Sequence, residues 1–239
     1  MKSKLIKIPF HDWKHIEHFN LKHHQIHLWC IELPPHIKLI KTYENLHELK
    51  KQRHQLVKHL LKNYIQQDLN DTDFLILPSG KPILKNHELQ YNITHSQHYL
   101  LLLIHLNKPV GIDFEYISRR HIQNFSKRFF GENWYETKLR PQRQCLQRIA
   151  FFQAWTQTEA WVKAHAETIF NFSAFEAQHL LSRHCWQHHN WQLLSFMPYL
   201  NGIASICCSS NIEEVFIKNI DLSQPRVLKD ALIEGVFHG

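Results

Sequence analysis

The sequence GIDFE at residues 111–115 is the clearest structural signal in this chain. It predicts a buried strand that carries two carboxylates. Side chains at positions i and i+2 of a strand leave the same face, so Asp113 and Glu115 should point the same way. Carboxylates on an apolar strand are costly to bury without a compensating partner, so this strand should meet such a partner elsewhere in the fold.

The partner is predicted about forty residues later, in the sequence WTQTEAWVKA at residues 155–164. This segment lies in a long helix that is apolar on most sides, as expected for a helix in a protein interior. Residues three and four apart are neighbours on a helix, so Thr156, Glu159 and Lys163 form one polar row. If the row packs over the strand, three carboxylates and a lysine converge. Such an oxygen-rich cluster suits Mg²⁺ together with substrate phosphates, and the sequence therefore predicts a site for phosphate chemistry.

The composition is that of a globular protein with an anionic partner. The chain has 239 residues, of which 44% are apolar, enough for one large domain or two small ones. Its formal charge of +7 favours a negatively charged partner without identifying it. The five cysteines show no metal or redox spacing. The histidines of residues 184–189 lack a second cluster of matching spacing, which favours ordinary surface histidines over a zinc site.

No segment predicts export or membrane insertion. Residues 1–13 contain lysines but lack the apolar core of a signal peptide, and Pro9 interrupts them. The densest apolar run, residues 99–106, is broken by His105 and is far shorter than the roughly 20 residues of a transmembrane helix. We therefore expect a cytoplasmic protein that has no membrane partner.

The chain predicts two successive groups of strands and helices, which indicates an α+β fold. In the first group we expect strands at 25–33, 89–94 and 99–106 and an amphipathic helix at 44–65. The second group contains a strand at 110–116, helices at 121–130, 134–139 and 142–165, and strands at 191–196, 202–208 and 213–217. A proline-containing turn at 107–109 separates the groups. We place an N-terminal lobe at 1–108 and a C-terminal lobe, carrying the metal site, at 109–239.

Four motifs occur in an order that resembles a known family: GKP at 80–82, YNITHS at 91–96, GIDFE at 111–115 and the helical segment 155–164. The sequence HLW at 27–29 is similar to the opening strand of the same family. The chain resembles the 4′-phosphopantetheinyl transferases of the surfactin-synthetase-activating type. These enzymes move phosphopantetheine from coenzyme A to a serine of an acyl or peptidyl carrier protein. The resemblance covers roughly residues 27–165.

The resemblance implies two similar α/β lobes that form a pseudo-dimer, with coenzyme A in the cleft between them. It also implies a Mg²⁺-dependent enzyme that releases 3′,5′-ADP. Three carboxylates would hold Mg²⁺ against the pyrophosphate: Asp113, Glu115 and Glu159. Glu159 and Lys163 would act in catalysis, with Lys163 on the same pyrophosphate. Further side chains would receive the phosphates of the nucleotide end: Lys81, Thr94, His95 and, on a looser match, Lys58. Lys58 is equally well explained as one more lysine on a solvated helix face.

The chain departs from the family at several positions. Thr158 stands where a lysine usually precedes the glutamate, and Thr94 replaces a serine. Ala166 and Thr168 replace glycines after the helix. The position of a glutamate proposed as general base is occupied by Trp134. The serine proton would then pass to one of several alternatives: Glu132, Glu136, a metal-bound water or Glu159.

Other functions stay open at this point. The same carboxylates and lysine also describe Mg²⁺-dependent phosphodiesterases or nucleases. A non-catalytic protein that binds coenzyme A or nucleic acid is a further alternative. A nucleic-acid binder should show a concentrated basic stripe with exposed aromatic residues, whereas the lysines here are scattered. We therefore expect a carrier protein and coenzyme A as partners, no nucleic acid, and a monomer.

Overall fold

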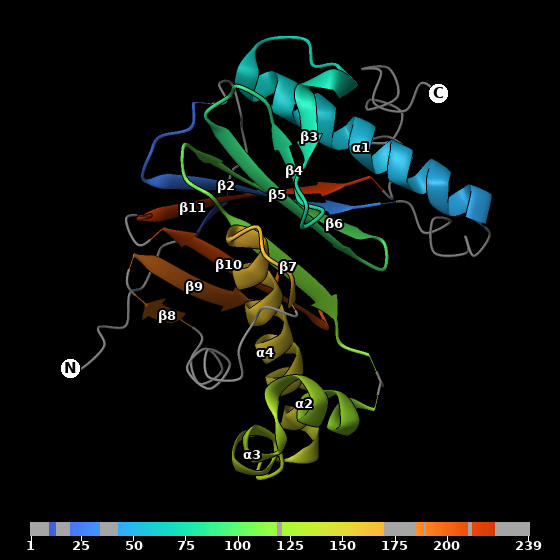
Figure 1. The fold of residues 1–239 in the computed structure, drawn as a ribbon, viewed down its shortest axis with the longest axis vertical. Helices are drawn as coiled ribbons and strands as arrows, with labels where there is room; N and C mark the ends of the chain where they lie inside the picture. The colour runs from blue at the N-terminus through green and yellow to red at the C-terminus, as the bar shows by residue number, and fades with distance from the viewer. Residues whose placement is uncertain are drawn as a thin grey trace.

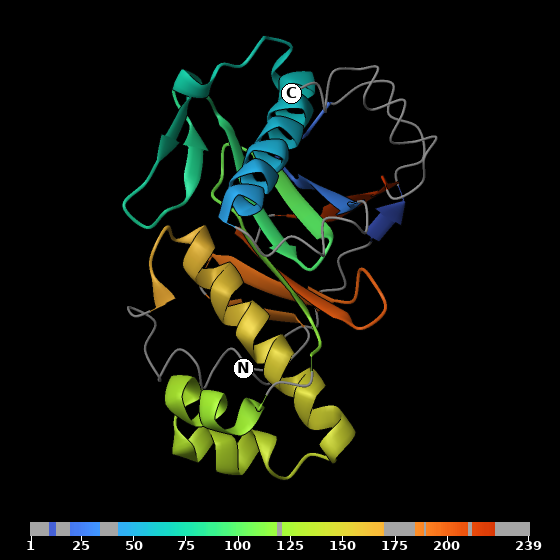
Figure 2. The same cartoon turned by 90° about the vertical axis from the view of Figure 1, so that its right-hand side faces the viewer.

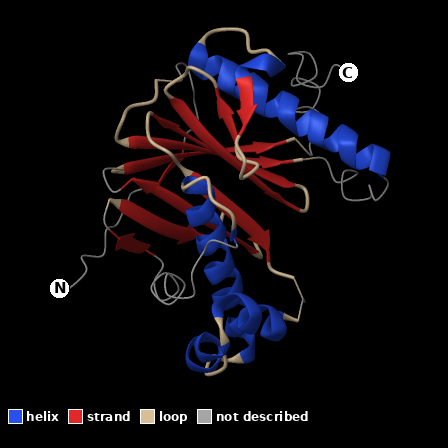
Figure 3. Ribbon diagram, viewed as in Figure 1, coloured by secondary structure: helices blue, strands red, loops and turns tan. Residues whose placement is uncertain are grey.

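Two stacked β-sheets form the centre of this computed structural model (Figures 1 and 3). The structure describes residues 10–12, 20–33, 43–118, 121–169, 185–188, 190–209 and 212–222. Helices and strands are mixed along the chain, which confirms the predicted α+β class. The expectation that two similar lobes form a pseudo-dimer stays a prediction.

The first sheet has five strands in the order β1-β11-β2-β6-β5. Their bounds are Phe10–Asp12 for β1, Gln25–Glu32 for β2, Leu89–Ser96 for β5, Tyr99–Leu106 for β6 and Glu214–Asp221 for β11. Strand β11 pairs in parallel with both β1 and β2, and the other pairs are antiparallel. This order leaves β5 at one edge of the sheet.

The second sheet has four antiparallel strands in the order β7-β10-β9-β8. Their bounds are Gly111–Tyr116 for β7, Cys185–His188 for β8, Trp191–Phe196 for β9 and Gly202–Ser209 for β10. A separate hairpin joins β3, Phe74–Ile76, to β4, Pro82–Leu84. Strand β7, which carries the two predicted acids, is therefore an edge strand.

Two long helices accompany the sheets: α1, Tyr43–Ile65, and α4, Gln144–Ala164. The short helices α2, Ile122–Phe130, and α3, Glu132–Trp134, and a π-helical turn, Tyr135–Leu139, gather beside the first half of α4 (Figure 2). A 3-10 turn, Asp71–Asp73, follows α1. No helix within the described ranges combines the length and apolar composition needed to span a bilayer.

The core lies on both faces of the first sheet, because the strands alternate apolar side chains to both sides. Leu101 and Leu103 of β6 join the cluster between the two sheets, whereas Leu100, Leu102 and Ile104 pack beneath α1. All five leucine and isoleucine side chains are fully buried. The continuous apolar run of residues 99–106 is thus a central strand covered on both sides, as such runs often are.

The expected boundary at residue 108 separates β6 from β7, but it does not divide the chain into two independent lobes. Strand β11, from the C-terminal part, lies between β1 and β2 in the first sheet. The sequence pattern identified a strand near this position but carried no information about its partner, because strand pairing depends on contacts far apart in the chain. The C-terminal segment therefore contributes to both sheets.

Helix α4 approaches the start of β7 very closely at Gly111. A Cβ atom added there would lie within 2.5 Å of the Ala164 nitrogen and still closer to the Ala160 carbonyl oxygen. Both of these are backbone atoms, which cannot rotate away. The glycine that begins the GIDFE motif is therefore required for the contact between strand and helix.

We expect Gly111→Ala to destabilise the protein, because the methyl group would push α4 away from β7. Overpacking of this kind typically costs about 1–3 kcal/mol, and a clash with backbone atoms belongs at the upper end of that range. Urea unfolding followed by circular dichroism measures the effect. Lys108→Ala, at an exposed position just before the strand, is the control and should change stability by less than about 0.5 kcal/mol. Equal stability of the two variants would contradict the close contact.

Candidate active site

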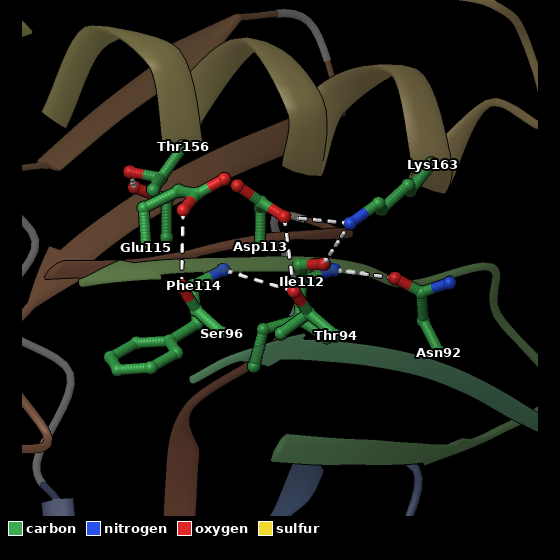
Figure 4. Close-up of polar contacts among 10 residues, drawn as sticks. Asn92, Thr94, Ser96, Ile112, Asp113, Phe114, Glu115, Thr156 and Lys163 are labelled. Atoms are coloured by element: carbon green, nitrogen blue, oxygen red, sulfur yellow. Dashed lines mark hydrogen bonds and ion pairs between the residues drawn. The ribbon is translucent and has the colours of Figure 1, made fainter. Parts of the chain in front are cut away.

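Side chains of β5 bind the free edge of β7 and join the two sheets (Figure 4). An edge strand presents unpaired backbone N–H groups that need partners. Three alternate side chains of β5 accept them: Asn92 Oδ1 from Ile112 N at 2.8 Å, Thr94 Oγ1 from Phe114 N at 3.2 Å and Ser96 Oγ from Tyr116 N at 3.1 Å. We call this set the β5 ladder. Its regular spacing follows from the two-residue repeat of a strand.

Two hydroxyl groups of the β5 ladder also hold the predicted acids. Thr94 donates to Asp113 Oδ1 at 3.0 Å, and Ser96 donates to Glu115 Oε2 at 3.1 Å. Both carboxylates leave β7 on the same side and face α4, as the alternation predicted (Figure 4). Each hydroxyl therefore accepts a hydrogen bond from one backbone N–H of β7 and donates one to the carboxylate of the residue just before that N–H.

Lys163 of α4 forms an ion pair with Asp113. Its Nζ atom lies 2.7 Å from Asp113 Oδ1 and 3.3 Å from the Ile112 carbonyl oxygen. The Asp113 side chain is only 7% exposed, so the pair is largely shielded from water. The second oxygen, Asp113 Oδ2, is buried without a hydrogen-bond partner in the described part of the chain. Buried polar atoms rarely lack a partner, so this oxygen marks a place for a donor or a cation.

Glu159, one turn before Lys163 on α4, is the third acid. Burial raises its pKa above the ordinary glutamate value, and the negative charge of Asp113 raises it further. Lys163 acts in the opposite direction but does not cancel these effects. Glu159 therefore lies close enough to Asp113 for the two charges to repel each other, and the folded protein disfavours its ionised form.

These groups surround one pocket of about 470 Å³. Seven of the eight predicted site residues line it: Lys81, Thr94, His95, Asp113, Glu115, Glu159 and Lys163. Strand β7, helix α4, strand β5 and the β3–β4 hairpin all contribute to its wall. The sequence prediction that the acid pair and the helical row converge is consistent with this placement.

The three predicted metal ligands share the pocket but do not form a closed set. Among the described residues, no three His, Cys, Asp or Glu side chains are grouped so as to hold a metal ion. Lys163 and Thr94 occupy Asp113 Oδ1, and Ser96 holds one oxygen of Glu115. The carboxylates and the unpartnered Asp113 Oδ2 nevertheless match the oxygen ligands that Mg²⁺ prefers. The oxygen atoms of these side chains are therefore of the chemical type that binds a hard cation such as Mg²⁺.

Lys58 is not part of this pocket. Its Nζ atom lies 2.9 Å from Asp71 Oδ1, next to His54, on the side of α1 that faces the 3-10 turn.

Arg53, on the same helix as Lys58, is a candidate site residue that the sequence analysis missed. Burial lowers its pKa, its Nε atom is buried without a hydrogen-bond partner in the described residues, and its charge lowers the pKa of His95. Arg53 precedes buried Leu56 and Val57 by three and four residues, so its position on the apolar face was the available signal.

His95 lies in the pocket wall with an uncharged ring at neutral pH. The surrounding protein, followed by the charges of Arg53 and Lys163, lowers its pKa to about 4, although part of the ring reaches solvent. The cationic role predicted for His95 from the sequence would therefore require an anionic ligand beside the ring. An anionic ligand beside the ring would raise this pKa again.

Two of the departures from the family pattern, Thr158 and Trp134, lie away from the pocket, whereas a third, Thr94, lines it. Thr158 is 1% exposed and donates to the Ala154 carbonyl oxygen, so a cation at this position would not have lined the pocket. Trp134 is buried in the helical group. The alternative bases Glu132 and Glu136 form exposed ion pairs with Lys127 and Arg140 and do not line the pocket.

Comparison with known proteins supports the family predicted from the motifs. Residues 109–210 match the 4′-phosphopantetheinyl transferase superfamily. The chain is 27% identical to the 4′-phosphopantetheinyl transferase HetI of Nostoc sp. over 158 residues, which are 63% of this chain and 66% of HetI. It is 37% identical to the 4′-phosphopantetheinyl transferase gsp of Aneurinibacillus migulanus over 109 residues, 44% of each chain. The matched part spans less than two thirds of the length of either relative. Both relatives are 4′-phosphopantetheinyl transferases, so the resemblance predicted from the motifs is confirmed.

We expect Glu159→Gln to raise the stability of the protein at neutral pH. The raised pKa means that the folded state holds an ionised Glu159 less favourably than the unfolded state does, and the amide removes that charge. The gain should be present at neutral pH and should vanish as the pH falls below the ordinary value of 4.5, where glutamate is protonated in both states. Thermal unfolding at pH 7 and pH 4 measures it.

The matched control is Glu132→Gln, which removes an exposed glutamate paired with Lys127. This variant should show no gain at neutral pH, because the charge that it removes is solvated and paired. A loss of stability in Glu159→Gln at pH 7 would contradict the repulsion between Glu159 and Asp113.

Proposed function

We propose that this chain, whose residues 109–210 match the 4′-phosphopantetheinyl transferase superfamily, transfers phosphopantetheine from coenzyme A to a serine of a carrier protein. One observation carries the proposal: three carboxylates from β7 and α4 line a single pocket with Lys163 and His95. Phosphoryl transfer depends mostly on positioning and on neutralising charge, and these are the groups that such a reaction needs.

Mg²⁺ is the cation that we propose for the three carboxylates, Asp113, Glu115 and Glu159. When bound, it would neutralise charge on the pyrophosphate of coenzyme A, and 3′,5′-ADP would leave. Asp113 Oδ2 has no hydrogen-bond partner among the described residues, so a cation could bind it without breaking a contact there. The Lys163 ammonium, already fixed by Asp113, would bind the pyrophosphate from the α4 side.

The nucleotide end of coenzyme A would lie toward β5 and α1. His95 lines the pocket there, and Arg53 acts on it electrostatically. We therefore propose Arg53 in place of Lys58 as the basic residue of α1 for a phosphate. Arg53 does not line the pocket itself, but its Nε atom is buried without a hydrogen-bond partner among the described residues, and a guanidinium is well suited to bind a phosphate group.

A smaller apolar pocket of about 80 Å³ adjoins the acidic one and shares Glu115 and Trp155 with it. Its other lining residues are His121, Ile122, Phe125, Phe151 and Phe152. We propose that it receives the less polar pantetheine end, which would place the phosphate to be attacked between the two pockets. Glu159, which lines the acidic pocket, would accept the proton of the serine hydroxyl.

The carrier protein is the proposed second substrate. The formal charge of +7 would speed its encounter with an acidic partner and make the rate depend on salt. The expectations of a monomer and of a cytoplasmic location stay predictions from the sequence.

The direct test incubates the protein with coenzyme A, Mg²⁺ and several apo carrier proteins and follows the carrier mass by mass spectrometry. We expect a gain of one phosphopantetheinyl group. Glu159→Gln should lower the rate by at least about 100-fold, because it removes a charge from the transition-state environment, whereas Glu132→Gln should keep the rate. No mass gain with any carrier, or cleavage of nucleic acid that is lost in Asp113→Ala, would contradict the transferase assignment.

We also expect binding of coenzyme A to be coupled to proton uptake at His95. The free ring has a pKa of about 4, and a bound phosphate would raise it, so affinity should increase as the pH falls from 7.5 toward 5.5. Calorimetry at pH 6.5 in buffers of different ionisation enthalpy measures the protons taken up. His95→Gln is the control. Protons taken up by the phosphates of coenzyme A contribute equally to both proteins, so the difference in uptake between them reports on His95. Equal uptake by both proteins would remove His95 from the phosphate site.

A further inference from the structure

Lys81 connects the β3–β4 hairpin to the two elements that carry the acids. It follows Gly80, whose φ of +86° makes the turn before β4. The side chain is only 8% exposed, and its Nζ atom donates to the Val110 carbonyl oxygen at 2.9 Å and to the Lys163 carbonyl oxygen at 2.7 Å. Two of the three N–H groups of the ammonium are therefore bound to backbone.

The two carbonyl groups that bind Lys81 lie at the start of β7 and at the end of α4. Val110 directly precedes β7, the strand of Asp113 and Glu115. Lys163 lies in the last turn of α4, where carbonyl groups lack partners within the helix. The same carbonyl also accepts from the backbone N–H of His165 at the end of the helix and, in a longer bond of 3.4 Å, from Ala166 N. A cation at this end of a helix is also favoured by the helix dipole.

Ala166 adds a reason for such a contact. Its φ of +55° is the left-handed conformation in which glycine usually ends a helix, and alanine adopts it at a cost. The end of α4 therefore lacks its preferred residue. The Lys81 ammonium supplies a charged hydrogen bond, one of the stronger kinds, at this same turn.

We propose that Lys81 is a positioning residue that ties the start of β7 to the end of α4 and so sets Asp113 opposite Glu159 and Lys163. The nearby contact of Gly111 with Ala160 and Ala164 fixes how closely the two elements approach, and Lys81 fixes them at their ends. Because the ammonium retains little solvent, burial lowers the pKa of Lys81 to about 8. One N–H group is left for a ligand in the pocket, so binding of phosphate is at most a secondary role.

The test is hydrogen exchange of the ligand-free protein, followed by mass spectrometry or NMR, in Lys81→Met. Methionine keeps an unbranched apolar stem and removes the ammonium. We expect amides of residues 161–164 and 111–113 to exchange at least about tenfold faster, because loss of a charged hydrogen bond favours local opening. Lys81→Arg retains a cation with several donors and should recover most of the protection.

Lys85→Met is the matched control. Lys85 lies just beyond β4, and its Nζ donates to the Thr72 carbonyl oxygen at 2.7 Å, so it makes the same kind of bond without reaching α4 or β7. It should leave exchange of residues 161–164 unchanged. Should Lys81→Met fail to fold, the measurement is made on Lys81→Gln, whose amide keeps one donor.

Ligand binding and turnover separate the two roles of Lys81. A positioning role predicts faster exchange without ligand, a lower kcat and a dissociation constant for 3′,5′-ADP changed by less than about threefold. A phosphate-binding role predicts unchanged exchange and at least about tenfold weaker binding of 3′,5′-ADP. Unchanged exchange in Lys81→Met overturns the proposal. The kcat readout rests on the proposed transferase activity, but the exchange readout does not, so the two proposals can fail separately.

Discussion

The β5 ladder is the interaction on which the site depends. Strands β5 and β7 are edges of different sheets, and an exposed edge is a liability in any β protein. Here Asn92, Thr94 and Ser96 saturate the free N–H groups of β7 with their side chains. The two sheets are thereby joined without a shared backbone pairing. Thr94 and Ser96 use the same hydroxyl groups to orient Asp113 and Glu115, so the contact that joins the sheets also builds the acidic wall of the pocket.

The carboxylates of the pocket are only partly compensated by positive charge. Asp113, Glu115 and Glu159 share one wall, and Lys163 compensates only Asp113 directly. Burial, followed by the charge of Asp113, raises the pKa of Glu159, and Asp113 Oδ2 is buried without a hydrogen-bond partner among the described residues. Binding sites commonly accept such a cost, because a ligand or an ion repays it on binding. These buried, poorly compensated carboxylates are the groups to which we assign the proposed cation.

Much of the site was predictable because it follows from local periodicity. The two-residue repeat of β7 places Asp113 and Glu115 on one face, and the helical repeat of α4 places Glu159 beside Lys163. Lys58 was assigned to the pocket on a loose match, whereas the neighbouring Arg53 lies on the apolar face of α1 and acts on His95. Attention to the face of the helix, rather than to the motif alone, would have favoured Arg53. The lowering of the pKa of His95 to about 4 was not predictable, since it depends on how much protein surrounds the ring.

The sequence by itself determined the elements, the order of the motifs and the chemical kind of the site, because these depend on residue type and on repeats of two or about four residues. Only the tertiary structure decided the pairing of β11 with β2, the two backbone contacts of Lys81 and the meeting of β5 with β7. Each of these joins residues that are about 20 to 190 positions apart, with Glu214 opposite Gln25 as the longest. No local pattern encodes such contacts, because they are set by the packing of whole sheets and helices against one another.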